Sequence, residues 1–261
     1  SNVDVPGGGL VSFDAAEASQ SQVPALQLLV ALGYKPLSQA EALALRGGRL
    51  RNVVLDDVLA DSLMRINRFT HKGREYGFDL ADVHEAMRRL KPTPDRMKGL
   101  RGTNQDVYDS LLLGTTITKT IDGDSKSYSF RFIDWEHPEN NVFHVTAEYA
   151  VERTGSTQTK RCDIVGFVNG IPFLVIENKR PTETLKKARS QLIGYQGEDS
   201  IPQLFHFAQL LMTMNRAEAR YATVGSGHQY WQTWRDEEDS DTSVAAAANR
   251  PLTPPEKGAV F

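Results

Sequence analysis

The chain has 261 residues, of which 30 are lysine or arginine and 33 are aspartate or glutamate, and its formal net charge is −3. This balance excludes a basic field over the whole molecule, so a nucleic-acid partner would have to meet a local basic patch. A single cysteine excludes an internal disulfide and cysteine-rich zinc motifs. No apolar run approaches the ~20 residues that span a bilayer. We therefore expect a protein of the reducing cytoplasm, with no membrane partner.

The first part of the chain is predicted to be mostly helical. Residues 1–15 are rich in glycine and are expected to form a flexible N-terminus. Over residues 16–115 apolar side chains recur at helical spacing. The predicted helices cover residues 26–32, 39–45, 53–66, 80–90 and 105–113.

From residue 116 the pattern changes from helices to strands. Predicted strands cover residues 116–121, 128–135, 141–152, 209–215 and 219–226, and turns are predicted at residues 122–124 and 136–138. Residues 116–235 are thus predicted to form a second region, built around a sheet. Residues 236–261 are typical of a linker followed by the start of a helix.

A hairpin lies at the centre of this second region. Two apolar segments, residues 162–168 and 173–179, are joined by Asn169-Gly170. This dipeptide is the strongest short-range signal for a two-residue hairpin turn. We therefore predict two adjacent antiparallel strands.

Three charged side chains lie at the open end of this hairpin. Pairing across the turn brings Asp163 beside Glu177, and Lys179 shares the face of Glu177 because strand side chains alternate. Mg²⁺ needs only one or two carboxylates, since water, backbone and phosphate supply its other ligands. A bound metal activates water and a lysine can orient it, so the three residues predict a metal-dependent phosphodiesterase site. The simpler alternative is a solvated ion pair.

A helix is predicted after the hairpin, over residues 183–195. Gln191 and Tyr195 lie one turn apart and share a helical face. Arg180, Lys186 and Lys187 precede them and, with Lys179 and Arg189, form a basic cluster beside the predicted site. Because of this position we interpret the cluster as a candidate DNA contact. A second basic cluster is interpreted as a solvated face; it contains Arg89, Lys91, Arg96, Lys98 and Arg101.

The hairpin and this helix together resemble a known family. Asp163, Glu177-Asn178-Lys179 and the pair Gln191 and Tyr195 stand in RCDIVGFVNGIPFLVIENKRP and ARSQLIGYQ. Their order and spacing resemble the amino-terminal nuclease domain of the restriction (motor) subunit of type I restriction-modification enzymes, in the PD-(D/E)xK nuclease superfamily. The resemblance is strongest over residues 141–235.

The resemblance implies an α/β (α+β) fold, in which a mixed central β-sheet is flanked by helices and preceded by a helical part. It implies that Asp163, Glu177 and Lys179 are catalytic and that Asp163 and Glu177 bind Mg²⁺. It also implies that Gln191 and Tyr195 contact DNA or support the site.

The activity implied by the resemblance is that of a type I deoxyribonuclease, which cleaves double-stranded DNA non-specifically after ATP-driven translocation. Its partners would be double-stranded DNA and the modification and specificity subunits. ATP would bind to a motor domain, whose phosphate-binding Gly-x-x-x-x-Gly-Lys-Ser/Thr loop this chain lacks. We therefore expect a fragment in which residues 236–261 lead toward an absent motor domain, with weak or absent cleavage on its own.

Two positions depart from the family pattern. Gln22 stands where an acid is expected on the first helix, and Cys162 stands where proline usually precedes the aspartate. Neither removes a core catalytic group, but the number of metal ions stays open. Two other functions also stay open: a non-catalytic DNA-binding or docking module with a degenerate site, and a repair-type nuclease of the same superfamily.

Overall fold

The computed structural model describes residues 22–93, 96, 98–215, 217–234 and 250–260. Its first elements are α2 (Val23–Ala31), β1 (Lys35–Leu37), α3 (Gln39–Leu45), α4 (Asp56–Ile66), β2 (Arg68–His71), β3 (Arg74–Gly77), α5 (Leu80–Leu90) and α6 (Gly99–Leu113). The following elements are β4 (Thr115–Ile121), β5 (Asp124–Phe130), η2 (Pro138–Asn140), β6 (Phe143–Glu152), β7 (Thr159–Val168), β8 (Ile171–Asn178), α7 (Leu185–Tyr195), α8 (Pro202–Phe205), β9 (Leu210–Met214), β10 (Ala219–Ala222), η3 (His228–Tyr230), β11 (Gln232–Thr233) and α10 (Pro254–Val260). Within the described residues, no helix combines the length and the apolar character needed to cross a bilayer.

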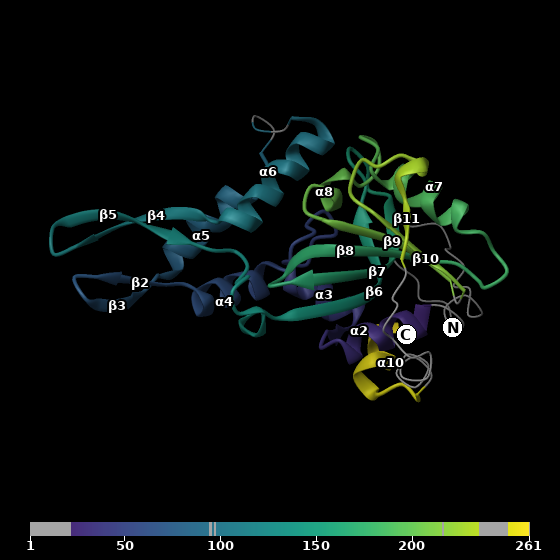
Figure 1. Cartoon of the computed structure of the whole chain (residues 1–261), viewed down its shortest axis with the longest axis horizontal. Coiled ribbons are helices and arrows are strands. Elements are labelled where there is room, and N and C mark those ends of the chain that lie inside the picture. Colours follow the sequence, from purple (N-terminus) through teal and green to yellow (C-terminus); the bar gives the residue numbers. More distant parts are fainter. Residues whose placement is uncertain (1–21, 94–95, 97, 216, 235–249, 261) are drawn as a thin grey trace.

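A mixed sheet of seven strands, in the order β1-β6-β7-β8-β9-β10-β11, forms the centre of the molecule (Figure 1). The β1–β6 and β8–β9 pairs are parallel, and the other four pairs are antiparallel. The predicted α/β (α+β) fold with a mixed sheet is confirmed. β1 pairs with β6, which lies far along the chain. β1 itself lies within residues 16–115, where the sequence predicted helices.

The predicted hairpin is formed by β7 and β8. Asn169 and Gly170 both have positive φ, 51° and 81°, as a type I′ turn requires. The Asn169 amide is buried and donates to the Phe132 carbonyl oxygen, while its Oδ1 accepts from the Val142 N–H. The turn therefore fixes one end of the hairpin inside the protein, and the opposite end carries the predicted site.

Helices cover the sheet on both faces. Leu26 of α2 and Ala259 of α10 pack with Ile164 and Ile176 in one buried cluster. A larger cluster packs on Val165 and Val175 from the other face and includes Leu55, Leu59 and Leu192. Alternate residues of β7 and β8 thus point into two separate cores, which is why residues 164–168 of β7 and 171–176 of β8 are continuously apolar.

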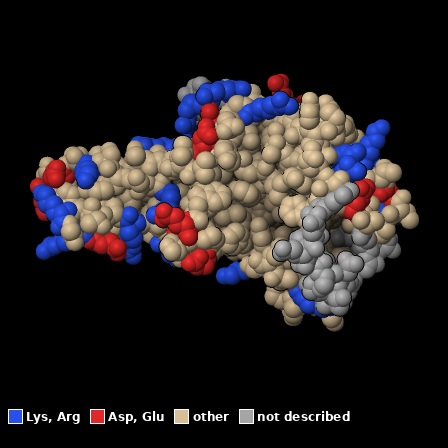
Figure 2. Space-filling view, in the orientation of Figure 1, with Lys and Arg blue, Asp and Glu red and all other residues tan. Residues whose placement is uncertain are grey.

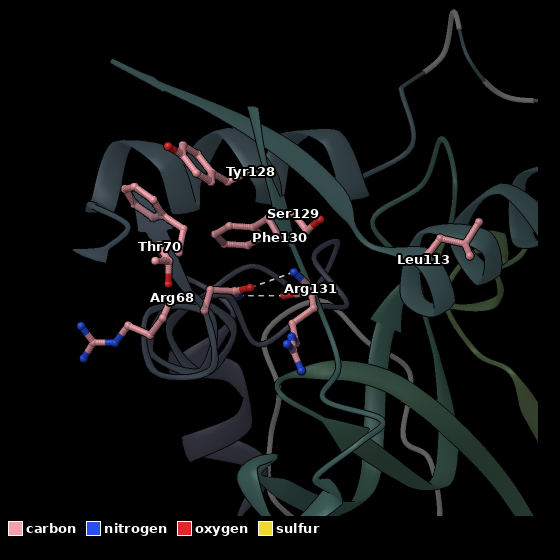
Figure 3. Close-up of a pocket in the computed structure, with 9 residues that line it drawn as sticks. Arg68, Thr70, Leu113, Tyr128, Ser129, Phe130 and Arg131 are labelled. Atoms are coloured by element: carbon pink, nitrogen blue, oxygen red, sulfur yellow. Dashed lines mark hydrogen bonds between the residues drawn. The ribbon is translucent and has the colours of Figure 1, made fainter. Parts of the chain in front are cut away.

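Two hairpins, β2–β3 and β4–β5, extend from the core with α5 as an elongated arm (Figure 1). Aromatic rings join the two hairpins, since Phe69 lies 4.8 Å from Phe78 and 4.4 Å from Tyr128 between ring centroids. A pocket of about 340 Å³ lies at the base of the arm, where the Asn67 side chain binds the backbone of Arg131 (Figure 3). The predicted site residues lie elsewhere, on β7, β8 and α7.

Candidate functional site

Asp163 and Glu177 lie side by side at the open end of the β7–β8 hairpin. The register pairs Ile164 with Ile176, so the two carboxylates occupy the next position along the strands. The Asp163 N–H donates to Glu177 Oε1 over 3.4 Å, and the Asn178 N–H donates to Asp163 Oδ2 over 2.7 Å. Each strand therefore fixes the carboxylate of the other.

The Glu177 carboxyl group is completely enclosed, with 0% of the residue exposed. Among the described residues none hydrogen-bonds its Oε2. Burial raises the pKa of Glu177 well above its ordinary range, the nearby Asp163 raises it further, and Lys179 acts in the opposite direction. A carboxylate pair with an unsatisfied buried oxygen is an environment that a cation would stabilise.

Lys179 follows directly after β8 and is also buried. Its backbone N–H donates to the Met214 carbonyl oxygen of β9 over 2.9 Å, so a third strand fixes its main chain. Lys179 lowers the pKa of the Glu177 carboxyl group, as a neighbouring cation does. The structure thus brings Asp163, Glu177 and Lys179 together, and their catalytic role remains a prediction.

Gln191 and Tyr195 connect α7 to β7. The Gln191 amide donates to the Tyr195 hydroxyl oxygen over 2.6 Å, and that hydroxyl donates to the Arg161 carbonyl oxygen over 2.9 Å. A hydroxyl has one proton to donate, and here it is used within the protein. Burial raises the pKa of Tyr195, and Glu177 raises it further. Of the two predicted roles, this geometry favours supporting the site over direct contact with DNA.

The basic residues near the site differ in exposure. Lys186 and Lys187 are exposed on α7, with Lys187 Nζ 3.6 Å from Glu183, and Arg180 is half-buried. Figure 2 shows lysine and arginine side chains at the end of the molecule that carries α7. Three residues of the second basic cluster form ion pairs: Arg89 with Glu85, Lys91 with Asp56 and Lys98 with Asp106.

Glu148 of β6 is a buried acid near Asp163 that the sequence analysis missed. Its Oε1 accepts from the Gln22 amide over 2.8 Å, and the same amide nitrogen donates to the Asp163 carbonyl oxygen over 2.9 Å. Its Oε2 pairs with the Arg161 Nε over 2.5 Å. The only sequence signal was an acid between two apolar strand residues, Ala147 and Tyr149.

The sheet, the hairpin and its charged end define a nuclease-like α+β fold. Over residues 14–230 the chain matches the family described as type I restriction enzyme R protein N terminus. The match covers most of the chain, and the protein belongs to this family. The resemblance recognised from the hairpin and helix residues is therefore confirmed.

Relatives of the chain carry names of the same kind. It is 28% identical over 198 residues to the type I restriction enzyme HindI endonuclease subunit of Haemophilus influenzae, a match that covers 67% of this chain and 18% of that subunit. It is 27% identical over 218 residues to the putative type I restriction enzyme MjaVIIIP endonuclease subunit of Methanocaldococcus jannaschii, covering 80% of this chain and 18% of that protein. The matched part is thus less than a fifth of the length of either relative.

Proposed function

We propose that this chain is the Mg²⁺-dependent endonuclease domain of a type I restriction enzyme R subunit. It would cleave double-stranded DNA non-specifically after ATP-driven translocation by a motor domain outside this sequence. The observation that carries the proposal is the interlocked pair of Asp163 and Glu177 with the buried Lys179 beside it. Membership of the R protein N-terminal family and the names of the relatives support it.

The donor set fits Mg²⁺. Both carboxylates offer oxygen, and the enclosed Glu177 Oε2 has no described hydrogen-bond donor. Within the described residues no group of three or more His, Cys, Asp or Glu side chains is placed to hold a metal, so two carboxylates and water match the site better than a full protein cage. When bound, Mg²⁺ polarises a phosphoryl oxygen and lowers the pKa of a coordinated water.

The chain's own residues have separate tasks in this proposal. Asp163 and Glu177 hold the cation, and the Lys179 ammonium orients the attacking water and offsets charge in the transition state. Arg180, Lys186 and Lys187 contact phosphates. Such contacts fix position without reading bases, so selection of the target belongs to the specificity subunit, with the modification subunit as a further partner.

Substitutions in the full-length subunit test this function. In the assembled restriction complex, Asp163→Asn and Lys179→Ala are each expected to lower plasmid cleavage by about 10²-fold or more. ATP hydrolysis should remain as in the wild type, because the motor is a separate domain. Cleavage is followed by gel electrophoresis and hydrolysis by phosphate release.

Lys126→Ala serves as a matched control, because Lys126 is an exposed lysine on β5 of the arm. It should leave cleavage unchanged. Full cleavage by the Lys179→Ala enzyme would instead identify the chain as a DNA-binding or docking module. Loss of ATP hydrolysis together with cleavage would indicate a folding defect, which circular dichroism of the variant would show.

A further inference from the structure

Glu148 has a backbone conformation that is unusual for a strand. Its φ is 57°, in the left-handed region that residues other than glycine rarely adopt. The pairing of β6 with β7 skips Glu148 and the facing Asp163, since the neighbouring pairs are Ala147 with Ile164 and Tyr149 with Cys162. Strained residues persist only where their surroundings hold them, so the contacts of the Glu148 side chain indicate what the strain maintains.

The first contact reaches Asp163 through Gln22. A side-chain amide has two N–H donors, and the Gln22 nitrogen uses them on Glu148 Oε1 and on the Asp163 carbonyl oxygen. A carboxylate only accepts hydrogen bonds. Glu148 therefore determines which end of the Gln22 amide faces Asp163, since its oxygen end would repel both acceptors.

The second contact reaches α7 through Arg161. The Arg161 side chain pairs with Glu148 Oε2, and the Arg161 carbonyl oxygen accepts from the Tyr195 hydroxyl. Arg161 and Asp163 flank Cys162 on β7. Glu148, which is only 5% exposed, thus holds β7 on both sides of Cys162.

We propose that Glu148 is a positioning residue: through Gln22 and Arg161 it holds the β7 segment that presents the Asp163 carboxylate to a divalent cation. The inference rests on the proposed metal-dependent function and adds a residue on a different strand. Groups that orient the ligands of a metal typically change its affinity by about 10–100-fold when they are replaced.

Metal affinity of the 261-residue chain tests the inference directly. Calorimetric titration with MnCl₂ would compare the wild type with Glu148→Gln, which keeps the size of the side chain but removes the charge that pairs with Arg161. We expect binding to weaken by about 10-fold or more. Glu152→Gln is the matched control, because Glu152 lies on the same strand and pairs with the exposed Arg51. It should bind as the wild type does.

A double variant separates positioning from simple charge. Gln22→Glu combined with Glu148→Gln exchanges the acid and the amide, so the pair can still hydrogen-bond to each other. The carboxylate at position 22 cannot donate to the Asp163 carbonyl oxygen. Positioning therefore predicts that binding stays weak, and recovery of wild-type affinity would overturn it.

Two further variants make each outcome decisive. If Glu148→Gln binds Mn²⁺ as the wild type does while Asp163→Asn loses binding, the inference is overturned and the proposed function stands. If the wild type binds no more tightly than Asp163→Asn, both are overturned. If circular dichroism shows that Glu148→Gln does not fold, Gln22→Leu tests the same link from its other end. It should weaken binding by a similar factor, and unchanged affinity would contradict the inference.

Discussion

The Glu177 carboxyl group is buried beside Asp163, and the protein is expected to lose stability when this group ionises without a cation. Burial raises its folded-state pKa well above the ordinary value of 4.5. The folded state therefore binds the proton more strongly than the unfolded state does. This contribution to stability is fully present below 4.5 and is lost as the pH rises through the folded-state pKa.

Glu177→Gln should consequently stabilise the metal-free chain. Near neutral pH the variant avoids the cost of either burying a charge or taking up a proton at position 177, and we expect the free energy of unfolding to rise by about 1 kcal/mol or more. Thermal unfolding in a chelating buffer measures the difference across pH. The difference in unfolding free energy between Glu177→Gln and the wild type should shrink as the pH falls toward the ordinary carboxyl pKa. A gap of constant size would contradict the burial argument.

The proximity of Asp163 and Glu177 was predictable because they lie on neighbouring strands of one hairpin. Asp163, Glu177 and Lys179 are joined by one short hairpin. The turn alone would place Asp163 opposite Ile176, and the register shift between Gly166 and Phe167 brings it opposite Glu177. Glu148 was missed because its partners, Gln22 and Arg161, come from a helix terminus and a neighbouring strand. A break in strand pairing at one acid leaves no periodic signal in a single sequence.

At the scale of elements, the β7–β8 turn is fixed by contact with the chain before α4. The Leu55 N–H donates to the Gly170 carbonyl oxygen. A Cβ atom at Gly170 would lie 2.5 Å from the Leu55 carbonyl oxygen and 2.9 Å from the Leu59 nitrogen. Backbone atoms cannot move away as a flexible side chain can, so this glycine is required both for its positive φ and for the close approach.

Gly170→Ala is therefore expected to destabilise the protein by about 2–4 kcal/mol. Urea unfolding followed by circular dichroism measures the change. Gly194→Ala is the matched control, because Gly194 is an exposed helical glycine of α7 and a Cβ there meets no described atom within 4 Å. The control should be stabilised by up to about 1 kcal/mol. Equal effects of the two substitutions would refute the proposed clash.

Helix boundaries were predictable where the sequence carries end signals. α3 and α5 begin after capping boxes formed by Ser38 with Glu41 and by Asp79 with Asp82, and both were predicted with the observed bounds. The predicted helix at residues 53–66 begins at Asp56 instead, because Leu55 is tied to the β7–β8 turn. The predicted strand over residues 128–135 ends at Phe130, where the Arg131 N–H binds Asn67.

At the scale of the whole molecule, distant segments complete the sheet. β1 pairs with β6 at one edge of the sheet. α10 and α2 pack together on the sheet face that carries Ile164 and Ile176. The hairpin β2–β3 in the arm and the strand β1 were not predicted, since each strand has only 3 or 4 residues. β1 acquires its structure from β6, a partner far along the chain, and β2 and β3 are too short to show an alternating pattern. The predicted division near residue 115 remains a prediction.

The uneven distribution of charge leads to a prediction about DNA binding. The molecule has a net charge of −3, so affinity for a duplex would depend on local groups such as Lys186 and Lys187. Replacing both with alanine should weaken binding at every sequence alike. It should also reduce the slope of log K against log salt by about 2, because each phosphate contact releases about one counterion.

Fluorescence anisotropy with a labelled duplex at several salt concentrations measures this slope. The control replaces Lys98 and Lys126, two exposed lysines outside the basic cluster beside the site. Both double variants lose the same charge, so general electrostatics changes equally. Identical slopes for the two would show that α7 makes no special contact with the duplex.

The hydrogen bonds of Asn169 also have a chemical consequence. Asparagine followed by glycine is prone to deamidation, in which the next backbone nitrogen attacks the side-chain carbonyl carbon, ammonia leaves and a cyclic imide forms. In the folded protein the Asn169 amide is buried and bound to Phe132, Asn141 and Val142, which prevents that attack. Aspartate at this position would accumulate only in molecules whose hairpin has opened. The fraction of aspartate at position 169 in a stored sample therefore measures how often the turn opens.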